Sequence, residues 1–175
     1  MAFYVAYDSG VLGNTGRSFD LSYDYESLVI ELCEVLAEAD GARFTLSGFG
    51  REPWPVSVDY DMSVFLEQLP DLLENLESGD VFRLDMYSQG TEAKLEFSPD
   101  GEEVTITCSS RTAWVPNPDT ERIEASALLR MLRRLAADFA LSARTADPAL
   151  ATVEPFDRWL TWDEAGSGTG ADGER

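Results

Sequence analysis

The sequence predicts an α+β domain: a mainly antiparallel sheet of about six strands with three helices packed on it, in the order β-α-β-β-α-β-β-β-α. Three segments carry apolar residues at helical spacing. Three consecutive alternating segments are joined by short turns, and the regular strand–helix alternation of a parallel sheet is absent. With 175 residues, of which 44% are hydrophobic, the chain is long enough to bury one core.

The first part of the chain is expected to combine strands with one helix. Strands are predicted at residues 2–7, 42–48 and 55–60. Residues 8–22 are rich in Gly, Ser, Asn and Asp, which predicts a loop. From Tyr25 to Ala39 the apolar residues share one helical face, and Gly41 follows where a helix often ends in glycine.

The second helix is predicted from Met62 to Leu76, and a proline interrupts it. Pro70 has no N–H to donate to the preceding turn, so we expect either a kink or a fresh helix start with Pro70 in its first turn. An antiparallel meander follows, with strands predicted at residues 81–87, 92–97 and 103–108.

The rest of the chain is expected to complete one domain. A third helix is predicted over Leu128–Ala140, and the apolar segment Pro148–Trp162 is expected to dock on the body. Residues 1–163 are therefore predicted to form a single α+β domain. Residues 164–175 are rich in glycine and are predicted to be a flexible tail.

Cysteine usage and the N-terminal residues indicate a cytoplasmic protein. Cys33 and Cys108 lie in apolar segments far apart in the sequence, which favours two buried thiols in a reducing compartment over a disulfide. The first residues lack the basic and apolar regions of a signal peptide. No run of 18 apolar residues is present, so no membrane partner is expected.

The charge is strongly negative and unevenly distributed. There are 33 acidic and 13 basic residues, with no histidine, for a net charge of −20. Residues 1–110 carry 22 of the acids and 5 of the bases. Such a field repels nucleic acid and attracts basic partners. A solubility effect or a salt-adapted host is the competing explanation.

The sequence gives little support for catalysis. Without histidine, a catalytic dyad or triad based on that residue is excluded. Two distant cysteines cannot form a zinc site. A carboxylate pair, Asp59 and Asp61, could bind Mg²⁺ or Ca²⁺, but the following residues do not match an EF-hand loop. The competing interpretation is a helix start with Asp61 or Ser63 as its cap. No cofactor is predicted.

Two helices are predicted to present rows of acids. Glu67, Asp71 and Glu74 share one face of the second helix, and the first helix carries a similar row: Glu31, Glu34 and Glu38. Like charges at this spacing destabilise a helix, so a partner that neutralises them is a reasonable hypothesis. Solvated helix faces are the simpler alternative. Trp54, between two prolines, is interpreted either as an exposed anchor or as part of the core.

The stretch from Pro55 to Phe139 combines a strand, a Leu-rich helix with outward acids, a meander ending in Glu103-Val-Thr-Ile-Thr-Cys108 and a Leu/Arg-rich helix. This pattern, over about half of the chain, resembles the small acidic immunity proteins of bacterial polymorphic toxin systems. The resemblance rests on pattern, without an invariant motif. It implies a non-catalytic protein that blocks a basic toxin, such as a nuclease, through charge complementarity.

The functional prediction is a non-enzymatic, immunity-type inhibitor that binds a basic protein. The residues predicted to bind the partner are Glu31, Glu34, Glu38, Trp54, Asp59, Asp61, Glu67, Asp71 and Glu74. Three alternatives stay open: a regulatory or scaffold module that binds a small ligand or basic peptide, a carboxylate-metal enzyme, and a self-associating structural protein. A deep apolar pocket with converging polar groups would favour the small-ligand alternative.

Overall fold

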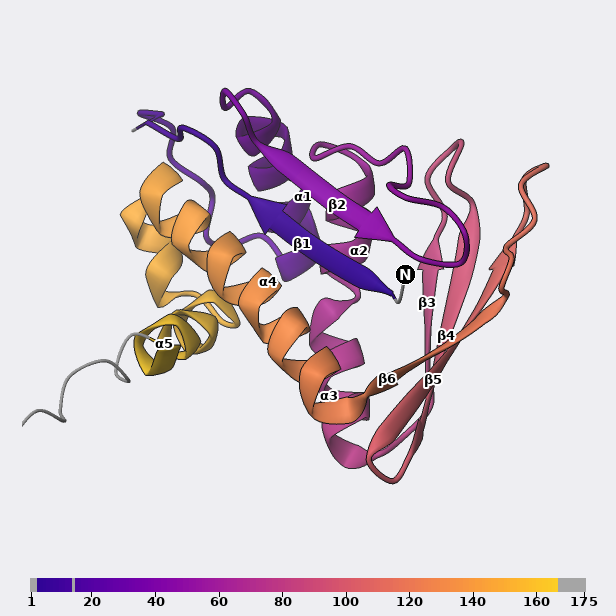
Figure 1. Cartoon of the computed structure of the whole chain (residues 1–175). Helices are drawn as coiled ribbons and strands as arrows, with labels where there is room; N and C mark the ends of the chain where they lie inside the picture. The colour runs from indigo at the N-terminus through magenta and orange to yellow at the C-terminus, as the bar shows by residue number, and fades with distance from the viewer. Residues whose placement is uncertain (1–2, 14, 167–175) are drawn as a thin grey trace, which may run out of the picture.

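The computed structural model describes residues 3–13 and 15–166, with side chains as far as Trp162. Their fold is α+β, as predicted (Figure 1). The strands are β1 (Tyr4–Asp8), β2 (Arg43–Ser47), β3 (Phe82–Met86), β4 (Ala93–Asp100), β5 (Glu103–Ser110) and β6 (Thr120–Glu124). The helices are α1 (Tyr25–Ala37), α2 (Asp61–Glu67), α3 (Leu69–Ser78), α4 (Ala125–Ala146), the 3-10 helix η1 (Pro148–Thr152) and α5 (Phe156–Gly166).

The strands form two antiparallel sheets, of two and four strands, where one sheet of about six strands was predicted. The larger sheet has the order β3-β4-β5-β6 and contains the predicted meander. Its side chains alternate: Leu84, Leu95 and Ile106 are fully buried, whereas Arg83 and Thr107 are exposed on the other face. β1 and β2 form a separate two-stranded sheet.

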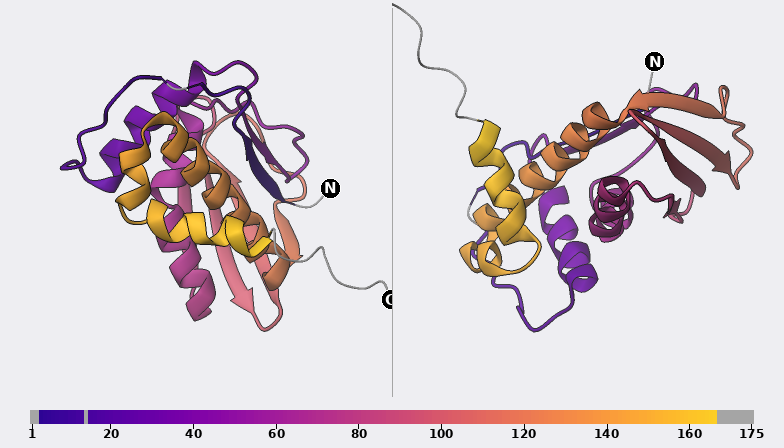
Figure 2. Two further views of the ribbon diagram at one scale, coloured as in Figure 1. Left: turned by 90° about the vertical axis from the view of Figure 1, so that its left-hand side faces the viewer. Right: turned by 90° about the horizontal axis from the view of Figure 1, so that it is seen from below.

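The helices cover the inner faces of both sheets. α4 runs beside β1 and packs against α5, whereas α1, α2 and α3 lie on the opposite side of the molecule from β6 and β1 (Figures 1 and 2). α2 and α3 pack on β3. The C-terminal segment docks as predicted, because Phe156 and Trp159 of α5 are fully buried against the core.

Pro70 divides the second predicted helix into two. α2 ends at Glu67, and α3 restarts at Leu69 with Pro70 in its first turn, which confirms the fresh-start alternative. The missing N–H of residue 70 would have bonded to the carbonyl of Leu66. The Tyr25 hydroxyl donates to that carbonyl instead, at 2.7 Å, and so joins α1 to the break.

The strands and helices of the structure differ from the predicted ones at three points. Residues 55–60 form no strand, and β6 is the sixth strand instead. Five α-helices are present in the described residues, where three were predicted. Ser57 shows why its segment does not pair: its N–H donates to the Asp61 carboxylate and its carbonyl accepts from Met62 N–H, so both groups bond locally.

Both cysteines are free and buried within the core, as expected. Burial raises the pKa of the Cys33 thiol well above its usual value and that of Cys108 to about 12. None of the helices in the described ranges is both long and apolar enough to cross a membrane. Most of the predicted flexible tail, from residue 167 onward, lies outside the described residues.

Candidate acidic binding surface

Most acidic side chains of α1 and α3 face solvent. Glu34 on α1 and Asp71 and Glu74 on α3 are exposed, because the buried stripes of these amphipathic helices point toward the core. Glu38 is exposed as well, and Arg17 lies 3.6 Å from its carboxylate. Glu31 is half-buried. The predicted acids of the two rows thus come from three helices, α1, α2 and α3, which lie on one side of the fold (Figure 2).

The start of α1 and the end of α2 each place an acid near Tyr25. Tyr25, whose hydroxyl holds Leu66, is close to the carboxylates of Glu26 and Glu67. Its pKa is raised well above the usual value, first by burial and then by the nearby Cys33 thiol and these two acids. The junction therefore links the acids of α1 to those of α2 and α3.

Two exposed tyrosines lie at the edge of this surface. The Tyr87 hydroxyl donates to Glu67 Oε2 at 2.7 Å, and Tyr60 lies close enough for its charge to influence Tyr87. Tyr60 is 53% exposed and Tyr87 is 50% exposed. Burial, the hydrogen bond to Glu67 and the nearby acids raise the pKa of Tyr87 to about 12. Tyrosines of this kind are frequent contributors to protein interfaces.

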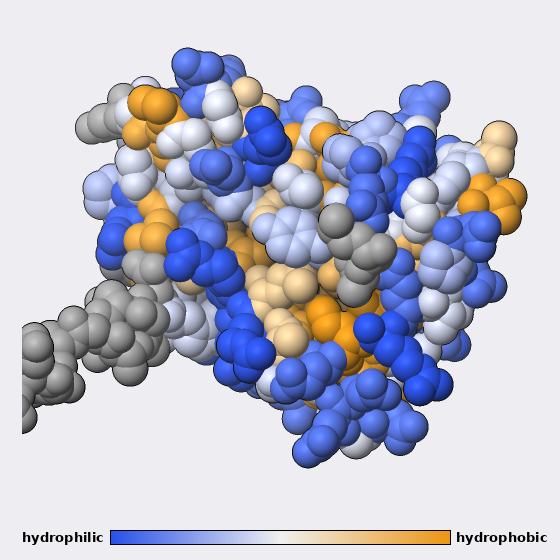
Figure 3. Space-filling view, viewed as in Figure 1, coloured by the Kyte–Doolittle hydropathy of each residue, from blue (hydrophilic) through white to orange (hydrophobic). Residues whose placement is uncertain are grey.

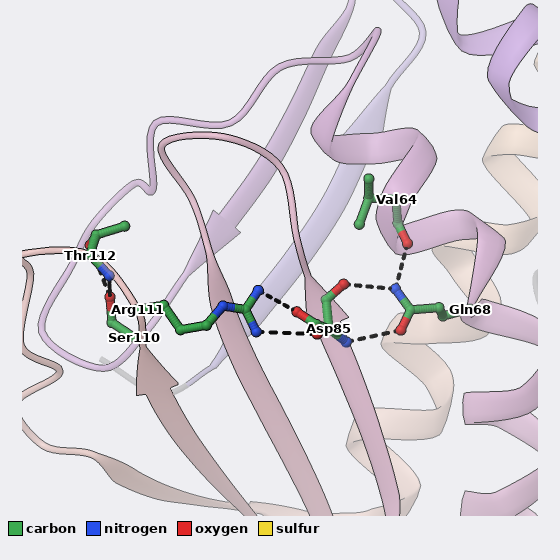
Figure 4. A network of polar contacts seen from close by, with 6 residues as sticks. All are labelled: Val64, Gln68, Asp85, Ser110, Arg111 and Thr112. Atoms are coloured by element: carbon green, nitrogen blue, oxygen red, sulfur yellow. Dashed lines mark hydrogen bonds and ion pairs between the residues drawn. The ribbon is translucent and has the colours of Figure 1, made fainter.

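A polar network fixes β3, the strand that immediately precedes Tyr87. Asp85 binds the Arg111 guanidinium through both carboxylate oxygens, at 2.7 and 3.2 Å. Its backbone is held by the Gln68 side chain, which donates to Asp85 O and accepts from Asp85 N (Figure 4). Because Gln68 is also bonded to Val64 O, the end of α2 and the end of β3 are held together.

Trp54 does not belong to this surface. Its side chain is 3% exposed, its Nε1 donates to Gly48 O at 3.1 Å, and its ring meets the Trp114 ring edge-on at 5.0 Å. The alternative that Trp54 is part of the core is therefore confirmed, and its assignment as an exposed anchor was wrong. The flanking prolines did not distinguish the two.

The Asp59–Asp61 pair is divided between surface and interior. Asp59 is exposed, but Asp61 is 6% exposed and accepts from Ser57 N and from the Thr91 hydroxyl, each at 2.8 Å. Asp61 was therefore wrongly assigned to the partner-binding face. The predicted helix cap is wrong as well, since Ser63 donates to Tyr60 O and Asp61 bonds upstream of α2. No group of three or more potential metal ligands occurs in the described residues.

Most of the acids in question have no basic partner. Glu34, Asp59, Asp71 and Glu74 form no ion pair with any residue in the described ranges. One arginine of α4, Arg133, reaches the acidic side of the fold, where it pairs with Glu77 at 2.8 Å and lies over the Trp162 ring. Internal pairing by the basic helix therefore leaves this surface largely unneutralised.

One hollow of the described surface is polar. Its volume is about 720 Å³, and it lies between α4 and the outer face of β1 and β2, lined by charges of both signs, including Asp8, Arg43, Arg134 and Asp138. Such a lining differs from the apolar pocket that the small-ligand alternative requires. Comparison of the chain with protein-family models, with curated proteins and with solved structures gives no match.

The sequence reasoning missed Glu26, Tyr60 and Tyr87. Tyr87 follows Arg83 and Asp85 in the alternation of its strand, so its exposure could have been predicted. Its contact with Glu67 could not, because these residues come from different elements.

Proposed function

We propose that this protein is a non-catalytic, immunity-type inhibitor that binds a basic protein through an acidic surface. This surface is formed by α1, α3, the end of α2 and Asp59, which precedes α2. The observation that carries the proposal is the set of exposed acids without ion pairs: Glu34, Asp59, Asp71 and Glu74. Their mutual repulsion is relieved when a basic partner docks, and the negative field speeds the encounter.

The two tyrosines supply the apolar part of the contact. Tyr60 and Tyr87 are half-exposed, and the Tyr87 ring is positioned by its hydrogen bond to Glu67. A partner lysine or arginine could stack on such a ring while it pairs with the neighbouring carboxylate. The anchoring role first assigned to Trp54 thus passes to residues that solvent can reach.

The test is an affinity pull-down of the tagged protein from lysate of its host at low and at high salt. The wild type is compared with a triple variant, Glu34→Gln, Asp71→Asn and Glu74→Gln, which neutralises exposed acids of the surface. We expect one basic protein to be retained at low salt and weakened at high salt. Each neutralised acid should weaken binding by roughly two- to fivefold, as for exposed charge pairs worth about 0.5–1 kcal/mol.

A matched control neutralises three acids elsewhere: Asp40→Asn, Asp100→Asn and Glu154→Gln. These residues are also exposed, and their side chains make no hydrogen bond or ion pair with a described residue. The control makes the net charge less negative by the same amount as the triple variant, but it leaves the acidic surface intact. Equal weakening by both variants would show that overall charge, and not this surface, governs the association. An empty pull-down at both salts would overturn the proposal.

A further inference from the structure

The two outer strands of the four-stranded sheet differ in how their free edges are treated. An edge strand presents unpaired N–H and C=O groups that can pair with another chain. On β3 the Gln68 side-chain amide occupies this position, donating to Asp85 O at 3.0 Å and accepting from Asp85 N at 2.9 Å (Figure 4). An added strand at β3 would have to displace this amide and the helices behind it.

At the opposite edge, on β6, the loop after β2 reaches the first residues, where Phe49 bonds to Asn117 N–H and to the Glu121 carboxylate. Among the described residues, no side chain bonds to the outward backbone groups of this strand. The Cys108 N–H donates to Asp119 O and the Ala125 N–H donates to Glu102 O, so every second residue from 119 to 125 bonds toward β5. The backbone groups of Thr120 and Arg122 and the N–H of Glu124 therefore point away from the sheet. No described residue forms a hydrogen bond with them.

Apolar surface formed by the described residues lies beside this edge. β6 lies at the front of the molecule in Figure 1. The matching surface view shows an apolar hollow between α4, β6 and the start of β1 (Figure 3). Ile123 of β6 and Met131 of α4 are only partly buried against the core. An added strand would find hydrogen-bonding groups on one side and apolar contacts near by.

The charge around the edge selects the occupant. Acidic residues dominate β6 and its immediate neighbours, namely Glu102, Glu103, Asp119, Glu121 and Glu124. The single base of β6, Arg122, lies 3.6 Å from the Glu103 carboxylate and is already paired. An extended segment with lysine or arginine side chains complements this surface. A second copy of the chain does not, because two molecules of net charge −20 repel each other.

We infer that the open edge of β6 binds an extended basic segment of a partner protein as an additional strand. This edge lies on the opposite side of the fold from α1, α2 and α3 (Figure 2), so the inference does not depend on the acidic surface proposed above. A partner that loses binding to the acidic surface can still bind here.

The test is amide hydrogen exchange of the full chain, followed by NMR, with and without a capped synthetic peptide of alternating lysine and valine. In the free protein, the Arg122 amide should exchange within about tenfold of an unstructured amide. The amides of Ile123, which points toward β5, and Asp85, which is bonded to Gln68, should be protected. The peptide should slow exchange at Arg122 by at least about tenfold and leave Asp85 unchanged.

Two matched peptides separate strand addition from charge attraction. Methylation of alternate backbone nitrogens of the lysine–valine peptide should abolish the protection of Arg122, because it removes the donors and keeps the charge. A glutamate–valine peptide should not bind. The inference is overturned by protection of Arg122 in the free chain, by protection that rises with protein concentration alone, which would indicate a second copy, or by equal action of the methylated peptide.

Discussion

Replacement of Asp61 should destabilise the fold far more than replacement of Asp59, two residues earlier. The Asp61 carboxylate is 6% exposed and accepts hydrogen bonds from Ser57 N and from the Thr91 hydroxyl, each at 2.8 Å. A hydrogen bond to a charged group contributes about 1.5–3 kcal/mol net, and removal of the carboxylate leaves both donors without an acceptor. Relief from burying a carboxylate offsets part of this loss. We therefore expect Asp61→Ala to lower the free energy of unfolding by about 2–4 kcal/mol.

The matched control is Asp59→Ala, for which the expected change is within about 0.5 kcal/mol because Asp59 is exposed. Urea denaturation followed by tryptophan fluorescence measures both. Asp61→Asn should lie between Asp61→Ala and the wild type, because one side-chain oxygen can still accept. A loss below about 0.5 kcal/mol for Asp61→Ala would refute the structural role. Stabilisation of the wild type by Mg²⁺ or Ca²⁺ that Asp59→Ala abolishes would restore the cation-site alternative.

Three further predictions concern the core and the acidic junction. Gln68→Ala removes the amide that caps β3, so we expect a loss of about 1–2 kcal/mol in urea unfolding and faster amide exchange at Asp85, whereas undiminished protection there would contradict the cap. Tyr87 should ionise near pH 12 in ultraviolet titration, and Glu67→Gln should lower that value. Because the folded pKa exceeds the usual value of 10, the contribution of Tyr87 to stability is complete below pH 10 and should fall between pH 10 and 12. Both cysteine thiols should resist a thiol reagent in the folded protein at neutral pH and react after unfolding, and a reactive thiol in the folded state would contradict their burial.

Local sequence patterns were sufficient for the elements whose hydrogen bonds are local or joined by short turns. The apolar stripe of α1 predicted its buried face, and the alternation with short turns predicted β3, β4 and β5. The break at Pro70 followed from a missing backbone donor. In each case the determining interaction is contained in the segment itself or in its nearest neighbour along the chain.

The predictions that were wrong or missing concern contacts between segments that are distant in the sequence. Alternation of Val56, Val58 and Tyr60 suggested a strand, but side-chain burial alone does not require a pairing partner, and the Ser57 backbone bonds to the start of α2. The burial of Trp54 depends on Trp114, sixty residues later in the chain. The candidate site followed the same rule: the acid rows were visible in the sequence, but the contact of Glu67 with Tyr87 required the end of α2 to meet the end of β3.

Salt should separate the two explanations of the negative charge, host adaptation and partner binding. Like charges spaced three or four residues apart cost roughly 0.2–0.5 kcal/mol per pair, so the several pairs on α1 and α3 are worth on the order of 1–2 kcal/mol. The Debye length falls from about 30 Å at 0.01 M salt to about 3 Å at 1 M, so NaCl over this range should raise the melting temperature by roughly 3–6 °C. The variant combining Glu34→Gln, Asp71→Asn and Glu74→Gln should show a smaller rise. An equal rise in that variant would assign the effect to general salt exclusion instead of the helix acids.

The same screening by salt weakens association with a basic partner. An acidic surface that serves stability in a salt-rich host and one that serves binding therefore predict optimal function at opposite ends of the salt range.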